Sequence, residues 1–412
     1  MTNNNQHIPS GYKSSPLGII PEDWEVKKVK DVSTIKGRIG YRGYTVDDIV
    51  DYGNGAISLS PSNIVDGKLQ FNSVTSITWE KYYESPEIML CNGDIVMVKT
   101  GSSFGKVAFV DNLPQEATIN PQFVIINNIK CDNKWLCYLF DSDCIQKNVH
   151  KIVVGGAIPT MSQEEIANFK IAVPTLPEQQ RIVSVLSLWD TAIAKQTALI
   201  EQLTLRKHGL MQQLLTGKKR LKGFREEWER IKAGEIFKSI SVKGNGTEVL
   251  LSATQEHGVI PRDQLEGRVT MPTGDTNSFK LVEVGDFVIS LRSFQGGLEY
   301  SEHRGIVSPA YTVLKPIVEI DKTFYRYYFK SAEFIGHLAI AVIGIRDGKQ
   351  ISYDDFCFVK IPYPNIEEQK AISAILLQGD KEIEIQKQKL LILQEQKKGL
   401  MQVLLTGKKR IK

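Results

Sequence analysis

Two short stretches of this 412-residue chain hold residue types that could do chemistry, and neither completes a catalytic motif. Residues 101–106, Gly-Ser-Ser-Phe-Gly-Lys, are similar to a phosphate-binding loop, but that loop has four residues between its glycines and Ser or Thr after its lysine. Here three residues intervene and Val107 follows the lysine. Residues 120–123, Asn-Pro-Gln-Phe, lack one proline of the motif with which methyltransferases hold a base amino group. The matching stretch 308–311, Ser-Pro-Ala-Tyr, also lacks the asparagine. A proline at the start of a strand explains both copies.

Metal and nucleophile motifs are also missing. The six histidines form no His-Glu-x-x-His pair, and no Gly-x-Ser-x-Gly stretch is present. The sequence therefore predicts no catalytic residue and no metal site in this chain.

Recognition of nucleic acid is the chemistry that remains. Residues 36–44 mix cations, glycines and aromatics, which suits contacts to phosphates and bases, although a solvated loop is an equal alternative. Loops 99–106 and 291–297 each follow a Gly-Asp strand and present a cation with hydroxyl or amide groups, as base edges require. Residues 346–349 add two cations before the second long helix. The residues predicted to contact DNA are Lys36, Arg38, Tyr41, Arg42, Tyr44, Lys99, Ser102, Ser103, Lys106, Arg292, Ser293, Gln295, Arg346 and Lys349.

An internal duplication organises the whole chain. Residues 208–222 and 398–412 are identical at twelve of fifteen positions, at an offset of 190 residues. The same offset carries Pro174 onto Pro364, while earlier matches such as Trp24 and Trp228 lie at other offsets. Each half is therefore a variable front segment followed by a preserved tail, which indicates pseudo-twofold symmetry within one chain.

Each preserved tail is predicted to be one long helix with an apolar seam. The helices are expected over residues 178–215 and 368–405, with Gly217 and Gly407 in left-handed caps. Apolar residues recur in alternating steps of four and three, the heptad spacing of a coiled coil. Polar seam residues coincide between the copies, Gln196 with Gln386 and Lys207 with Lys397. A helix packed only on its own domain is the alternative, but one this long would outrun such a domain. The apolar seam residues are Ile182, Leu186, Trp189, Ile193, Ile200, Leu203, Leu210, Leu214, Ile372, Leu376, Ile383, Leu390, Leu393, Leu400 and Leu404.

The front segments are predicted to be mixed α+β domains. Short β-rich runs such as 94–99 and 286–290 are broken by Gly, Asn and Pro, and aromatic helical stretches follow at 135–140 and 324–329. We expect those aromatics in the core rather than on a base-stacking surface. Composition agrees with ordinary globular domains, since 42% of residues are hydrophobic and 24% charged, and a net charge of +4 excludes neither DNA nor protein partners. We also expect a soluble, cytoplasmic protein, because no run of 18 apolar residues occurs.

Together these features resemble the DNA-specificity subunit of type I restriction-modification systems. The motifs are residues 20–24 (Ile-Pro-Glu-Asp-Trp), 176–182 (Leu-Pro-Glu-Gln-Gln-Arg-Ile), 366–372 (Ile-Glu-Glu-Gln-Lys-Ala-Ile) and the twin Gly-Leu-Met-Gln-x-Leu-Leu-Thr-Gly-Lys-Lys-Arg ends. The resemblance implies target-recognition domains at 1–175 and 223–365, each reading half of a bipartite, asymmetric DNA site. It implies spacer helices at 176–222 and 366–412 that pair as an antiparallel coiled coil and dock two modification (methyltransferase) subunits.

The resemblance also implies partners that carry the chemistry. Modification subunits would bring S-adenosylmethionine and methylate adenine, restriction (motor-nuclease) subunits would join for cleavage, and this chain would hold no cofactor. A coiled-coil scaffold without sequence-specific DNA recognition is the alternative. It does not explain why two large, divergent α+β domains are present.

Overall fold

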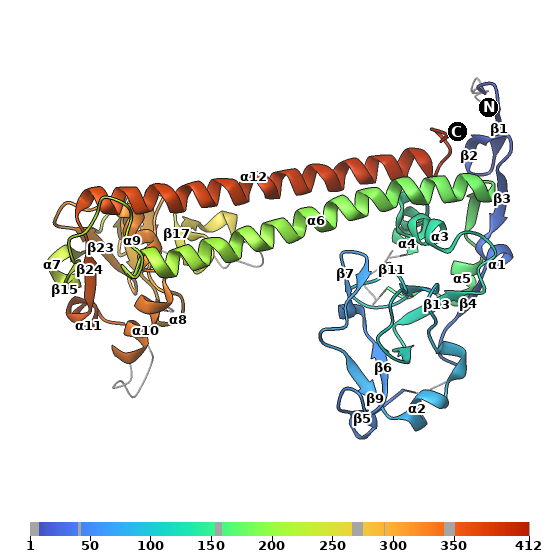
Figure 1. Cartoon of the computed structure of the whole chain (residues 1–412), viewed down its shortest axis with the longest axis horizontal. Helices are drawn as coiled ribbons and strands as arrows, with labels where there is room; N and C mark the ends of the chain where they lie inside the picture. Colours follow the sequence, from blue (N-terminus) through green and yellow to red (C-terminus); the bar gives the residue numbers. More distant parts are fainter. Residues whose placement is uncertain are drawn as a thin grey trace. The chain divides into compact units, whose positions relative to one another are not determined.

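The structure is a computed structural model that describes residues 8–39, 43–152, 159–265, 275–291, 293–341 and 351–411. The chain forms two compact units: unit 1 holds residues 1–195 and 389–412, and unit 2 holds residues 196–388. The long helices α6 (Leu176–Leu214) and α12 (Ile366–Leu404) contribute one part to each unit (Figure 1). We describe each unit by itself.

Unit 1 contains short strands and helices before α6. They are β1 (Tyr12–Ser15), β2 (Gly18–Pro21), β3 (Glu25–Lys28), α1 (Val29–Val32), β4 (Thr34–Lys36), β5 (Ile49–Val50), β6 (Ala56–Leu59), β7 (Ile64–Val65), β8 (Lys68–Leu69), β9 (Thr75–Ile77), α2 (Trp79–Tyr83), β10 (Ile95–Val98), β11 (Val107–Phe109), β12 (Ala117–Ile119), β13 (Phe123–Asn127), α3 (Asn133–Asp141), α4 (Asp143–Ile152), α5 (Gln163–Ala167) and β14 (Lys170–Val173).

Unit 2 repeats this plan between α6 and α12. Its elements are β15 (Glu229–Lys232), α7 (Ala233–Ile236), β16 (Phe237–Ile240), β17 (Leu251–Thr254), β18 (Gly258–Pro261), β19 (Lys280–Val282), β20 (Phe287–Ile289), α8 (Ser293–Gly296), β21 (Glu299–Tyr300), β22 (Gly305–Val307), β23 (Thr312–Pro316), α9 (Lys322–Tyr328), α10 (Ala332–Ala341), α11 (Tyr353–Phe358) and β24 (Lys360–Tyr363).

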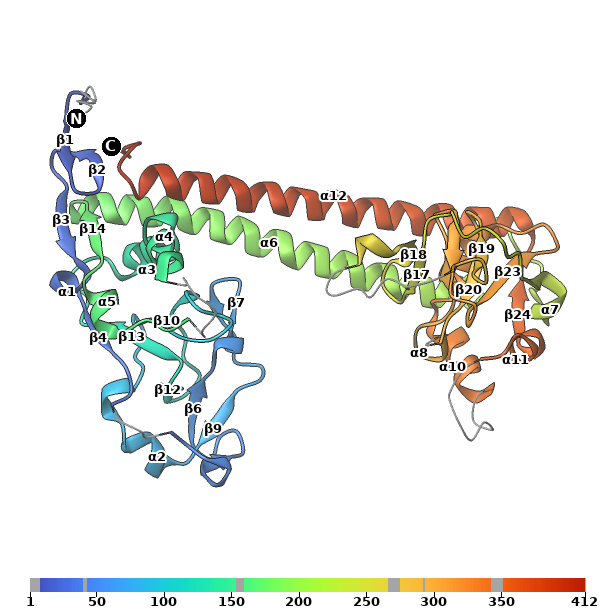
Figure 2. The same cartoon turned by 180° about the vertical axis from the view of Figure 1, so that it is seen from behind.

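The central sheet of unit 1 is buried on both faces. Its antiparallel strands lie in the order β11-β10-β13-β4. Because side chains alternate along a strand, Ile95 and Met97 of β10 face a layer of α3, α4 and parts of the long helices. Val96 and Val98 face the second sheet, β12-β6-β9-β5. Figures 1 and 2 show strands of the two sheets, β13 and β6, within the same globular part. Strands buried on both sides explain the short, wholly apolar runs in the sequence.

Unit 2 has the same central sheet with a smaller second layer. The order β21-β20-β23-β16 matches β11-β10-β13-β4 strand for strand. Phe287 and Ile289 pack with α9, α10 and the long helices, whereas Val288 faces the two-stranded sheets β17-β18 and β19-β22. The aromatic stretches predicted to be core are buried, with Trp135 of α3 and Phe324 of α9 both fully inaccessible. The α+β class and the pseudo-symmetry are therefore confirmed.

The predicted seam is the less exposed stripe of both long helices. In unit 1 the start of α6, through Ile182 and Leu186, packs with the end of α12, through Leu404. In unit 2 Leu214 of α6 packs with Ile372 near the start of α12. The helices therefore run in opposite directions in each unit. Burying one such side chain contributes about 1.5–3 kcal/mol.

The helix ends lie close to their predicted positions. Both helices begin two residues earlier than expected. In α6, Pro177 is accommodated in the first turn, where its missing N–H is not needed, and in α12 the matching position holds Glu367. Gly217 (φ +72°) and Gly407 (φ +70°) adopt the left-handed conformation predicted for them. The sequence segments 176–222 and 366–412 each contribute residues to both units. They are divided in this way because each half of a long helix packs on a different globular part.

Candidate nucleic-acid interface

Three connections meet at one end of the central sheet of unit 1. Because the strands pair antiparallel, Val98 at the end of β10 lies opposite Phe123 at the start of β13. Lys36, the last residue of β4, pairs with Ile125 of β13. The loops that follow β10 and β4 and the turn before β13 therefore share this edge, which we call the loop end of unit 1.

Hydrogen bonds hold the loop end together. The backbone N–H of Lys99 donates to the Gln122 carbonyl at 2.7 Å, and the N–H of Met161 donates to the Lys99 carbonyl at 2.9 Å. The hydroxyls of Thr100 and Thr160 lie 2.8 Å apart. A loop fixed in this way presents its side chains without an ordering cost on binding.

The side-chain amides at the loop end were not predicted from the sequence. Asn120 donates from Nδ2 to Oε1 of Gln122 at 3.1 Å, and Gln122 is only partly buried. Gly101 (φ +100°) passes so close that a Cβ there would lie 2.9 Å from Nε2 of Gln122. A glutamine amide beside cations is suited to the donor and acceptor edge of adenine. The Asn-Pro-Gln-Phe run was a signal for these residues, but the sequence reasoning compared only a catalytic motif with a strand-start proline and did not consider a DNA contact.

The structure places the predicted contacts of unit 1 in different environments. Lys106 and Ser102 are exposed, while Lys36, Lys99, Ser103 and Tyr44 are partly buried. Arg38 donates from Nη2 to the Ile119 carbonyl at 3.1 Å, and burial lowers the pKa of its guanidinium. Arg38 therefore supports the chain beside the loop end. Tyr41 and Arg42 lie outside the described residues.

The loop end of unit 2 has another composition. The hydroxyl of Ser293 accepts a hydrogen bond from the N–H of Ser290 at 2.8 Å, and Ser293 is buried. Because Ser293 is buried, a base could reach its hydroxyl only if the surrounding residues moved. Gln295 is exposed, and its reading role stays a prediction. Arg292, Arg346 and Lys349 lie outside the described residues.

Two lysines near the same end of unit 2 were missed by the sequence reasoning. Nζ of Lys280 donates to the carbonyl of Tyr311 at 2.6 Å, immediately before β23. Burial lowers the pKa of Lys280, and the positive charge of Lys243 lowers it further. The N–H of Leu281 donates to the Val242 carbonyl at 2.8 Å, so Lys280 and Lys243 lie on adjacent backbone segments. Two neighbouring cations repel each other, and a phosphate beside them would relieve that repulsion. The lysines are far apart in the sequence, and no spacing signal connects them.

Comparison with known proteins decides the family. The model of the type I restriction modification DNA specificity domain matches this chain twice, at residues 21–205 and 225–395. The chain belongs to this family. The two matches cover both repeats, so a scaffold that does not recognise DNA is not favoured.

Individual specificity subunits are similar along the same length. The protein named as the MjaX type I restriction enzyme specificity subunit of Methanocaldococcus jannaschii is 27% identical over 434 residues, covering 97% of each chain. The MjaVIII specificity subunit of that organism is 29% identical over 216 residues, 51% of this chain and 50% of the relative. A solved structure from work on type I R-M complex assembly and conformational transition covers 94% of this chain and 99% of its own, with 18% identity and a TM-score of 0.60. That last likeness concerns the fold.

The family motifs of this specificity chain form a contact that we call the end clamp. In unit 1, Arg410 binds both carboxylate oxygens of Glu178 at 2.6 and 2.7 Å, and the indole N–H of Trp24 donates to Glu178 at 2.9 Å. In unit 2, Arg220 and Trp228 bind Glu368 in the same way, each at 2.8 Å. The end clamps join the front segment, the start of one long helix and the residues after the other.

The glutamine after each clamp glutamate ties the helix start to the aromatic helix. Gln179 donates to the Pro174 carbonyl at 2.8 Å and accepts from the N–H of Asp132 at 2.7 Å. Gln369 repeats both bonds, to Pro364 at 2.8 Å and from Asp321 at 2.9 Å. The Glu-Gln motif of the specificity family is therefore structural in this chain.

Metal clusters and membrane-spanning helices are both absent from the part of the specificity chain that the structure describes. Within the described ranges, no group of three or more His, Cys, Asp and Glu side chains could hold a metal ion. Among the helices that the structure describes, none is both long and apolar enough to cross a membrane.

Proposed function

We propose that this chain reads DNA sequence for a type I restriction-modification complex, with each unit reading one half of a bipartite, asymmetric site. The observation that carries the proposal is the contrast between matched supports and unmatched loop ends. The strand orders of the two central sheets agree, and the end clamps use the same residue types. At the loop ends, unit 1 presents Gln122 beside Lys99, whereas unit 2 presents Lys280 beside Lys243. Equal supports with unlike side chains at the loop ends favour two different half-sites.

The remaining roles belong to partners and to the long helices. We infer that the paired helices set the spacer between half-sites and dock two modification subunits, which supply S-adenosylmethionine and the methyl transfer. Leu188, Leu205 and Leu391, outside the seam, are more than half exposed at 69%, 63% and 61%, as a docking surface requires. The chain itself would be non-catalytic and cytoplasmic, and restriction subunits would join the same complex.

The direct test is the methylation pattern of the reconstituted complex. The chain and its modification subunits would be expressed in a host free of adenine methylation, and methylated adenines would be mapped across the genome. We expect one motif made of two unlike half-sites separated by a fixed, unspecified stretch. An undivided motif, or no methylation dependent on this chain, would contradict the proposal.

A single substitution tests whether the two units read their half-sites independently. Gln122→Ala should relax the half-site read by unit 1, by about 1–3 kcal/mol for a bidentate base contact, and leave the other half-site unchanged. Gln115→Ala is the matched control, because Gln115 is a partly buried amide of the same unit that donates to the Gly55 carbonyl. Equal relaxation of both half-sites would remove Gln122 from a reading role.

A further inference from the structure

A three-residue contact fastens the recognition part of unit 1 to both long helices. Nζ of Lys397 on α12 lies 2.6 Å from Oδ1 of Asp190 on α6, and the hydroxyl of Tyr138 on α3 donates to Oδ2 of the same carboxylate. Nζ of Lys397 also lies 5.2 Å from the centroid of the Tyr138 ring. We call this contact the side clamp of unit 1.

Unit 2 contains the same contact with the helices exchanged. Lys207 of α6 pairs with Oδ1 of Asp380 on α12, and the hydroxyl of Tyr327 on α9 donates to Oδ2 at 2.5 Å. Nζ of Lys207 again lies 5.2 Å from the tyrosine ring centroid. The two side clamps use the same atoms in the same roles.

These contacts are directional, unlike the apolar packing around them. A leucine seam tolerates small rotations, because dispersion and apolar burial have no preferred direction. A charge-assisted hydrogen bond weakens steeply when its geometry is lost. Burial raises the pKa of Tyr138 and of Tyr327, and the adjacent carboxylate raises each further, so both phenols stay neutral donors. Each carboxylate has one oxygen on the tyrosine and the other on the lysine of the opposite long helix. The lysine holds the carboxylate in place, so a turn of the recognition part would strain the bond from the tyrosine.

We propose that the two side clamps are positioning sites that hold each recognition domain at one angle to the helices of its own unit, so that the complex accepts a single spacer length. This inference rests on the proposed function. Neither clamp reaches the loop ends, so loosening one should widen the accepted spacing and leave the half-site sequences unchanged.

The test uses the complete complex with its modification subunits. Duplexes would carry both half-sites with spacers from two base pairs shorter to two longer than the native spacing, and methyl transfer would be measured on each. We expect Tyr327→Phe to lower the preference for the native spacer over its neighbours about tenfold, the loss of one charge-assisted hydrogen bond. Lys207→Gln should do the same, and it replaces Tyr327→Phe if that variant does not fold.

The matched control is Tyr325→Phe, on the same helix. Its hydroxyl donates to the Pro362 carbonyl within the recognition part, and its ring is fully buried. This variant should lower the melting temperature and keep the native spacer preference. The inference is overturned if Tyr327→Phe destabilises the protein but keeps that preference, or if Tyr325→Phe loses it equally. A wild-type complex that methylates no divided site would instead overturn the proposed function.

Discussion

At the scale of single residues, the end clamps combine groups that lie far apart in the chain. Glu178 is 232 residues from Arg410 and 154 from Trp24. All three recur in the second repeat, so the sequence marks them as structurally constrained. It does not say which side chains meet, because a duplication preserves residue types and carries no pairing information. The amide of Gln122 and the lysine pair of unit 2 are harder still to predict, since they become neighbours only through strand register.

The unit 2 end clamp should be energetically important. Glu368 is buried, so Glu368→Gln would leave the Arg220 guanidinium without its carboxylate. We expect the free energy of unfolding to fall by about 2–3 kcal/mol. This loss is small for a broken buried ion pair, because Arg220 is partly exposed. Urea titration followed by tryptophan fluorescence would measure it. Glu367→Gln is the control, since its pair with Lys370 is exposed on both sides and should contribute little to stability. Equal effects of the two substitutions would contradict this account.

The unit 1 end clamp should depend on pH through Asp23. A hydrogen bond from Arg410 lowers the pKa of Asp23 from its usual 3.8, so folding favours the ionised carboxylate. The stabilisation is therefore present above about pH 4 and is lost as the pH falls through the lowered pKa. Asp23→Asn should lower the free energy of unfolding at pH 7 by less than about 1 kcal/mol for so exposed a pair, and the melting temperature with it. The difference from wild type should shrink in melts taken toward pH 3. A difference that stays constant with pH would show that the charge is not its origin.

At the scale of elements, the periodicity of the sequence predicted the long helices and their apolar seam, which recur in both repeats. It did not predict the features that differ between the repeats. The heptad steps located the seam, including Gln196, whose Nε2 lies 2.9 Å from Oε1 of Gln386 within unit 2. Both helix starts were predicted two residues too late. In the first repeat Pro177 was taken as a break although the first turn tolerates it, and the duplication carried the same boundary to the second repeat. The repeats differ at Gly379, where the first repeat has Trp189. The sequence does not predict the effect of this difference, because that effect depends on the neighbouring helix.

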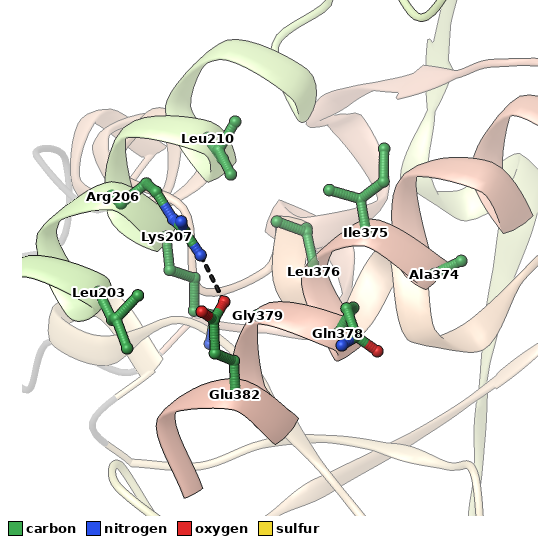
Figure 3. A pocket seen from close by; sticks show the side chains of 10 residues that line it. All are labelled: Leu203, Arg206, Lys207, Leu210, Ala374, Ile375, Leu376, Gln378, Gly379 and Glu382. Carbon is green, nitrogen blue, oxygen red and sulfur yellow. Dashed lines mark hydrogen bonds and ion pairs between the residues drawn. The ribbon is translucent and has the colours of Figure 1, made fainter. Parts of the chain in front are cut away.

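Gly379 leaves a hollow of about 390 Å³ beside the seam of unit 2. Figure 3 shows the hollow between α6 and α12, with Leu203 and Leu210 on one side and Leu376 on the other. The Arg206–Glu382 ion pair bridges the two helices there at 2.5 Å. A Cβ on Gly379 would meet only Cγ of Lys207, at an ordinary 3.7 Å.

Gly379→Ala should therefore raise the free energy of unfolding by about 1 kcal/mol, because alanine loses less backbone entropy than glycine in a helix. Gly407→Ala should do the opposite and cost more than about 1 kcal/mol. Its φ is +70°, and a Cβ would lie 2.4 Å from Cδ of Pro21. Thermal melts of both variants would check the pair, and a destabilised Gly379→Ala would mean that the helix needs the glycine at this position.

At the scale of the whole molecule, each long helix contributes to both units, so its length is a candidate ruler for the distance between half-sites. Each helix has 39 residues, about 58 Å at 1.5 Å per residue. The repeat and the heptad pattern predicted two front domains and two long helices with an apolar seam, and the family resemblance implied that the helices pair antiparallel. That each helix is shared between the two units was not predicted. The DNA sequence read and the length of its spacer were not predictable, because they depend on loop side chains and on geometry outside the repeat.

Lengthening both helices should lengthen the spacer. Four residues added beside Gln196 and four beside Gln386 extend each helix by about 6 Å, slightly more than one turn. Since duplex DNA rises about 3.4 Å per base pair, the recognised site should gain one or two base pairs between unchanged half-sites. Mapping methylated adenines in cells that express the altered chain with its partners would measure this. Full activity on an unchanged spacer would show that the helices do not set the distance.

The division of α12 between the units has a consequence for synthesis on the ribosome. Residues 389–412, which complete unit 1, are translated after the whole of unit 2. Until they emerge, Glu178 has no arginine partner, and the apolar face that includes Ile182 and Leu186 lacks its cover from Met401 and Leu404. Unit 2 can therefore fold first, while unit 1, whose first residues are translated earlier, keeps an apolar surface exposed to solvent. A nascent chain stalled before residue 389 should therefore bind chaperones through unit 1, which is translated first, and not through the residues translated last.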